Sequence, residues 1–155
     1  MKILIAVDGS SYSKAAARYV ARHLEAFNEP AEVVLLHVHL KIPYPIASTV
    51  VGRKAVDDYI RDTSREALKG AGRELDRAGV EYKSTWCIGD VAEEVDKFVR
   101  ANRVDLVVCG SHGHNAFVNL AMGSVANKLV ATLTVPVLLV TRKAAASMNR
   151  VKKAA

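Results

Sequence analysis

Three glycines and a serine, spaced G-x2-G-x9-G-[ST], form the most informative pattern in the chain: Gly110, Gly113, Gly123 and Ser124. An apolar run at 104–109 precedes them and a stretch of helical periodicity follows, so we expect a strand, a loop and a helix with Ser124 as its N-cap. Glycine lets backbone N–H groups approach a bulky anion because it has no Cβ, and a helix N-terminus offers free N–H donors. The pattern predicts a phosphate-binding loop.

Better-known loops do not match this spacing. A Walker loop needs a lysine before its final serine or threonine, and none follows Gly123. A dinucleotide fingerprint follows the first strand, whereas this loop follows the fourth. A nucleophile elbow needs G-x-S-x-G, and G-S-H-G at 110–113 is one residue short. The remaining alternative is an ordinary glycine loop that joins a strand to a helix.

Strands and helices are predicted to alternate along the whole chain. Apolar runs indicate strands at 2–7, 32–40, 80–87, 104–109 and 136–141, and periodic stretches indicate helices over about 11–27, 53–78, 91–101 and 124–133. This order predicts an α/β domain with a doubly wound, five-stranded parallel sheet, strand order 3-2-1-4-5, and helices on both faces. Ligands bind where such a sheet reverses its winding, here between strands one and four. Asp8 and Gly110 end those two strands.

Composition fits a single domain. Half of the 155 residues are hydrophobic, and we expect the domain over 1–142 with a basic, flexible tail at 143–155. Five of the 22 basic residues lie in 142–155, and the preceding 141 residues hold 17 basic and 16 acidic side chains, which argues against nucleic-acid binding. No signal peptide or membrane span is evident, and the two cysteines favour buried thiols, so we expect a cytoplasmic protein without membrane contact.

Taken together, these segments resemble the universal stress protein family. The matching stretches are ILIAVDGS at 3–10, LHV at 36–38, GDVAEE at 89–94, DLVVCGS at 105–111 and PVLLV at 136–140, together with the glycine pattern of the ATP-binding members. The resemblance covers nearly the whole chain. It implies a stress-response regulatory module that binds ATP, ADP or AMP, with Mg²⁺ as a companion ion of the phosphates.

The resemblance also assigns roles to residues. Asp8 would hydrogen-bond the ribose hydroxyls, main chain near Val38 would meet the adenine edge, and the glycine pattern with the N–H of Val125 would hold the phosphates. The residues that we expect to line the nucleotide are Ala6, Val7, Asp8, Gly9, Ser10, Val38, Cys109, Gly110, Ser111, His112, Gly113, His114, Gly123, Ser124 and Val125. His112 stands where the family often has arginine, which weakens the positive charge near the phosphates. The alternative role for Asp8 is a local cap of the next helix.

A metal-binding function is the first alternative hypothesis. His37 and His39 share one face of a strand, and Cys109, His112 and His114 follow strand four at the same edge of the sheet. Imidazole and thiolate are zinc ligands, although this spacing matches no standard zinc motif.

Two further alternatives are an enzyme and a scaffold that binds no nucleotide. No nucleophile is paired with a base, because Ser111 and His112 are adjacent and we expect their side chains to diverge. The sequence therefore predicts that the protein is not an enzyme. Slow ATP hydrolysis by a positioned water is the one catalytic activity that we expect to need a test.

The strand at 136–141 predicts a homodimer. It lies at the end of the predicted strand order and is apolar on both faces, and an edge of this kind is a liability in a monomer. Pairing with its own copy would cover the edge by a two-fold contact. The resemblance implies the same dimer.

Overall fold

The computed structural model of the chain describes residues 1–27, 30–41, 52–113, 122–141, 143–144 and 147. Its strands form one sheet in the order β3-β2-β1-β4-β5, and every neighbouring pair is parallel. The strands are β1 (Lys2–Ala6), β2 (Glu32–His39), β3 (Tyr82–Ile88), β4 (Leu106–Gly110) and β5 (Val137–Val140). The predicted fold class and strand order are confirmed.

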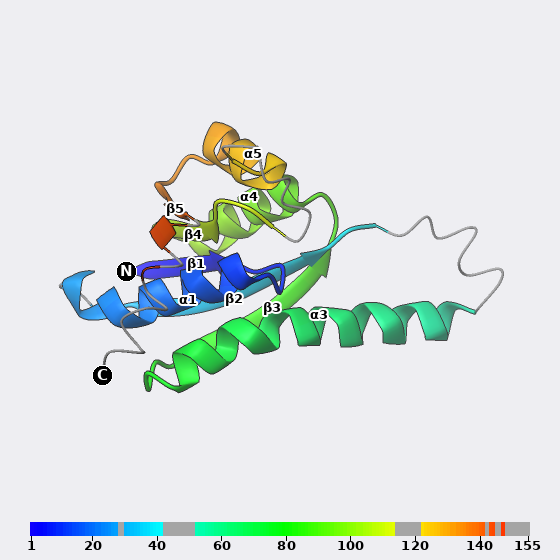
Figure 1. Cartoon of the computed structure of the whole chain (residues 1–155). Helices are drawn as coiled ribbons and strands as arrows, with labels where there is room; N and C mark the ends of the chain where they lie inside the picture. Colours follow the sequence, from blue (N-terminus) through cyan, green and yellow to red (C-terminus); the bar gives the residue numbers. More distant parts are fainter. Residues whose placement is uncertain (28–29, 42–51, 114–121, 142, 145–146, 148–155) are drawn as a thin grey trace.

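Helices cover both faces of the sheet (Figure 1). On one face lie α1 (Ser11–His23), which continues into the short 3-10 helix η1 (Leu24–Phe27), and the long α3 (Arg53–Asp76). On the other face lie α4 (Val91–Asn102) and α5 (Ser124–Thr132).

Alternate residues of the central strands supply the two cores. In β1, Ile3 and Ile5 pack with the α1 and α3 side chains, whereas Leu4 packs with those of α4 and α5. Successive side chains of a strand point to opposite faces, so a sheet covered on both sides needs an unbroken apolar run. The residues that follow β1 are therefore held by a strand that is packed on both faces.

Side chains cap the starts of α1 and α4. The Ser10 hydroxyl accepts from the N–H of Ser13 at 3.2 Å, and the Asp90 carboxylate accepts from the N–H of Ala92 at 3.0 Å. The third strand begins at Tyr82 rather than at residue 80, because the N–H of Val80 still bonds the Leu75 carbonyl at the end of α3. The 3-10 turn after His23 likewise ends the first α-helix earlier than expected.

A buried ion pair ties α1 to α3. The Arg18 guanidinium donates to both carboxylate oxygens of Glu74, from Nε at 2.8 Å and from Nη2 at 2.9 Å. Arg77 donates to the same carboxylate at 3.0 Å. The Glu74 side chain is 9 % exposed, so its charge depends on these partners. This pair sets how α3 lies against α1.

Two predictions concern membranes and the tail. Within the described residues, no helix has both the length and the apolar character needed to cross a membrane. Ala144 packs at the edge of the α1-side core, and its N–H donates to the Thr141 hydroxyl at 3.3 Å. Most of 143–155 lies outside the described residues, so the flexible tail stays a prediction.

Candidate functional site

Asp8 follows β1 at the edge of the sheet where β1 and β4 are neighbours. Its Oδ1 accepts from the N–H of Ser10 at 2.9 Å, and Gly9 between them has a φ of 82°, a left-handed conformation that suits glycine. Ser10, not Asp8, is the N-cap of α1. Asp8 Oδ2 accepts no hydrogen bond from the described residues. The local bond thus orients the carboxylate and leaves its second oxygen to face the loop after β4.

Gly113 brings that loop against Asp8. A Cβ at position 113 would lie 2.7 Å from Asp8 Oδ2, which is closer than side-chain carbons pack. The approach requires glycine here. Residues that end β1 and follow β4, 105 positions apart, thus meet at the sheet edge where the winding reverses.

Gly110 has a different reason to lack a side chain. A Cβ there would lie 2.5 Å from Tyr12 Cβ and 3.1 Å from the His112 carbonyl oxygen. The first turn of α1 therefore packs directly on the end of β4. Tyr12 was not among the expected site residues, since nothing in its local sequence marks it; its ring centroid lies 5.5 Å from that of His112.

The loop closes where α5 begins, and one expectation is wrong here. Gly123, not Ser124, is the N-cap, and no side chain caps the helix. The N–H of Gly123 donates to the Ser111 carbonyl at 2.8 Å, and its own carbonyl accepts from Asn127 at 3.0 Å, so the cap lies one residue before the predicted one.

This closure decides which donors are available to a ligand. The N–H of Gly123 is used within the protein, whereas those of Ser124 and Val125 have no hydrogen-bond partner among the described residues. Both residues are exposed. The first turn of α5 therefore presents N–H donors and the positive end of the helix dipole to solvent.

Ser111 and His112 also differ from expectation. Their side chains converge: Ser111 Oγ lies 2.9 Å from His112 Nδ1, because the chain turns sharply after β4 and the Tyr12 ring lies beside the imidazole. Ser111 is 3 % exposed. The contact holds the imidazole at the loop, and the hydroxyl lies on a buried residue.

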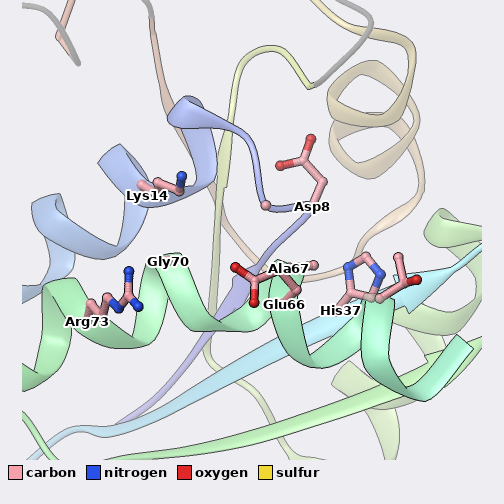
Figure 2. A pocket seen from close by; sticks show the side chains of 9 residues that line it. Asp8, Lys14, His37, Glu66, Ala67, Gly70 and Arg73 are labelled. Atoms are coloured by element: carbon pink, nitrogen blue, oxygen red, sulfur yellow. The ribbon is translucent and has the colours of Figure 1, made fainter. Parts of the chain in front are cut away.

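His37 lies on β2, near enough to Asp8 for the charge of that carboxylate to act on its ring (Figure 2). Its Nδ1 lies 2.7 Å from the Val7 carbonyl oxygen, and because a carbonyl can only accept, Nδ1 carries the proton. Burial is the main cause that lowers the pKa of His37; the bond to Val7 and the charge of Asp8 act in the opposite direction, and His39 adds to the lowering. His37 is therefore a neutral imidazole near pH 7.

The described residues hold no group of three or more histidines, cysteines or acids placed to bind a metal. The rings of His37 and His39 are nearly perpendicular, with centroids 6.3 Å apart. Burial, aided by the charge of Asp8, raises the pKa of the Cys109 thiol to about 12, so it stays protonated. His114, the remaining member of the suggested cluster, lies outside the described residues.

The other predicted positions gather at the same edge of the sheet. Ala6 ends β1 and Val7 follows it, and the N–H of Val7 donates to the Leu36 carbonyl at 2.9 Å. Val38, near the end of β2, is 8 % exposed and packs into the α4-side core, so only its main chain could meet a ligand.

The sequence of residues 1–141 matches the model of the universal stress protein family. The chain belongs to this family. Among curated relatives, universal stress protein YxiE of Bacillus subtilis is 31 % identical over 146 residues, covering 90 % of this chain and 97 % of YxiE. Universal stress protein MJ0531 of Methanocaldococcus jannaschii is 27 % identical over 141 residues, covering 91 % of this chain and 82 % of MJ0531.

Solved structures share the fold of this universal stress protein. The protein MJ0577 of Methanocaldococcus jannaschii superposes with a TM-score of 0.73 at 27 % identity, covering 91 % of this chain and 95 % of its own. An Arabidopsis thaliana family member with AMP bound has a TM-score of 0.65 at 18 % identity, covering 92 % of both chains. The Archaeoglobus fulgidus protein in complex with dAMP has a TM-score of 0.63 at 22 % identity, covering 90 % of this chain and 96 % of its own.

Proposed function

We propose that this universal stress protein binds ATP or another adenine nucleotide at the carboxyl ends of β1 and β4. The observation that carries the proposal is the approach of Asp8 Oδ2 to Gly113, where a Cβ would lie 2.7 Å away. The approach joins a carboxylate and a glycine loop at the sheet edge where ligands of open α/β folds bind.

Each part of a nucleotide has a matching group at this edge. The Asp8 carboxylate suits a ribose diol, because its outer oxygen can accept from a hydroxyl while Ser10 holds the inner one. The phosphates would lie at Gly113 and at the exposed N–H groups of Ser124 and Val125. Main chain at the end of β2, near Val38, would meet the adenine, and Mg²⁺ would accompany the phosphates.

Adenine nucleotides in family members of the same fold support this choice of ligand. The Arabidopsis thaliana protein holds AMP and the Archaeoglobus fulgidus protein holds dAMP. We take the full phosphate-binding pattern at 110, 113, 123 and 124 to favour ATP for this chain. His112 in place of arginine would make phosphate binding weaker and more dependent on pH.

We assign the protein a binding role and not a catalytic one. Ser111 contacts His112, which brings a hydroxyl beside an imidazole, but at 3 % exposure that hydroxyl cannot act on a bound phosphate. Slow hydrolysis by a positioned water would show as phosphate release that depends on ATP and is lost together with nucleotide binding.

The regulatory unit would be a homodimer formed through β5. The Pro136 and Val140 carbonyls accept bonds from β4, so the alternating Val137 and Leu139 direct their N–H groups away from β4. These groups lie at the end of the sheet, where a second copy could pair. Both cysteines are free thiols, which suits the cytoplasm.

Isothermal titration with ATP, ADP and AMP tests the nucleotide site. Gly113→Val should abolish binding while circular dichroism stays native, because the branched side chain would fill the space beside Asp8. Ala131→Val, at an exposed position of α5, adds a similar bulk and should bind as the parent does. Equal affinities of Gly113→Val and the parent would refute the placement of the site.

A further inference from the structure

A pocket of about 400 Å³ lies between α1 and α3, on the sheet face opposite to α5. Figure 2 shows side chains from both helices and from the ends of β1 and β2 around it. The residues that matter to its chemistry are Asp8, Lys14, His37, Thr63, Glu66 and Arg73. Small-molecule sites are commonly of this size.

Gly70 explains how Lys14 reaches the pocket. This glycine lies inside the 24-residue helix α3, where glycine costs roughly 0.5–1 kcal/mol relative to alanine. A Cβ at position 70 would collide with the Cε of Lys14. The lysine stem thus crosses α3 in the space that the glycine leaves, and it carries the ammonium group to the pocket wall.

Arg73 adds a second cation to the same end of the pocket. It lies one turn after Gly70, and Figure 2 shows its guanidinium on the side of α3 that faces Lys14. Neither cation has an ion-pair partner among the described residues, although Glu66 pairs with Lys69 at 3.2 Å. Two neighbouring positive charges repel each other, and a bound anion relieves that repulsion.

The opposite end of the pocket is suited to hydroxyl groups. Because Nδ1 of the neutral His37 donates to the Val7 carbonyl, its Nε2 is the hydrogen-bond acceptor of the ring. The Thr63 hydroxyl, which also lines the pocket, can accept or donate. A ligand that donates hydrogen bonds at one end and carries negative charge at the other matches this lining.

We propose that this α1–α3 pocket is a second ligand site, for a small polyhydroxylated molecule that carries a phosphate or a carboxylate. Its anionic group lies between Lys14 and Arg73, and its hydroxyl groups face His37 and Thr63. The pocket adjoins the proposed nucleotide site, because Asp8 and Gly9 border both. The proposed phosphate-binding groups of the nucleotide site lie at the start of α5, on the other face of the sheet.

Amide chemical-shift titrations with glucose 6-phosphate, gluconate and uncharged glucose test this proposal. We expect saturable shifts at Gly70 and Ala67 with at least one of the two anions and none with glucose. Shifts from the phosphate alone or from the carboxylate alone would identify the anionic group. Lys14→Met and Arg73→Met should each weaken binding roughly tenfold or more, the scale of one lost charge-assisted hydrogen bond.

Arg65→Met is the matched control, because Arg65 is exposed on α3 and does not line the pocket. It should leave the affinity unchanged. Shifts confined to Ser124 and Val125, an equal loss in Arg65→Met, or no saturable shift at Gly70 with either anion would each overturn the proposal.

Discussion

The carboxylate of Asp8 and the α-carbon of Gly113 approach each other at the sheet edge where β1 and β4 are neighbours. A Cβ on residue 113 would lie 2.7 Å from Asp8 Oδ2, while Oδ1 is held by the N–H of Ser10 at 2.9 Å. One oxygen therefore fixes the side chain, and the other is directed at the glycine loop. This division of roles is the basis of the first prediction.

Asp8→Asn should weaken nucleotide binding without disturbing the turn. An asparagine oxygen can still accept from Ser10, but the negative charge that favours ribose hydroxyls is lost, so we expect a loss of about 1.5–3 kcal/mol in binding free energy. The preference for AMP over dAMP should shrink as well if Asp8 contacts the 2′-hydroxyl. Calorimetry with both nucleotides measures this, with Asp105→Asn as the control at the far end of the sheet. A variant that keeps the parent affinity for AMP would contradict the role of Asp8.

Stability should fall as the pH drops through the unfolded pKa of histidine, about 6.5. Burial lowers the pKa of His37 in the folded protein, so the unfolded chain binds more protons below that pH and unfolding is favoured. Above it both states are neutral at this residue and the full stability is present. Urea midpoints between pH 5 and 7.5 should therefore decline toward acid in the parent and less steeply in His37→Asn. His23→Asn, an exposed substitution, should retain the parent slope; the same slope in all three proteins would count against His37.

Arg18→Met should destabilise the protein by about 2 kcal/mol. The change leaves the buried Glu74 carboxylate with Arg77 and without its bidentate partner, and an incompletely paired buried charge is costly. Arg100→Met removes an exposed pair with Asp96 and should cost less than about 1 kcal/mol. Urea denaturation of both variants distinguishes them, and equal losses would mean that burial of the Arg18 pair has no energetic weight.

The parent protein should sediment as a dimer at micromolar concentration, and Val137→Pro should sediment as a monomer. Proline removes the N–H that Val137 directs away from β4, so it disrupts pairing at the outer edge while sparing the bonds to β4. Leu40→Lys, at a 64 % exposed position after β2, should remain dimeric. A monomeric parent, or a dimeric Val137→Pro, would exclude pairing through β5.

The order of elements was predictable because its signals are local. Each central strand is a short apolar run, ended by Asp8-Gly9 after β1 and by Gly110 after β4, and Ser10 and Asp90 mark helix starts by their side-chain chemistry. Alternating strands and helices then leave few right-handed arrangements of a parallel sheet. The strand order and the edge at which Asp8 meets the glycine loop follow from those patterns.

Contacts inside the glycine loop could not be predicted in the same way. Ser111 and His112 converge, and Gly123 replaces Ser124 as the cap, because the loop returns to bond the Ser111 carbonyl. That return depends on where α5 lies against the sheet. No local pattern encodes the placement of one element against another.

The contacts of the two glycines in α3 also depend on tertiary packing. In the sequence, Gly70 and Gly72 only weaken a helix. In the structure, a Cβ at Gly70 would meet Lys14 of α1, and one at Gly72 would lie 2.5 Å from the Tyr82 hydroxyl of β3. Which neighbour each glycine admits depends on the rotation of α3 about its axis, which packing against α1 and the sheet decides. The pocket that Lys14 and Arg73 line exists only because these distant segments pack together.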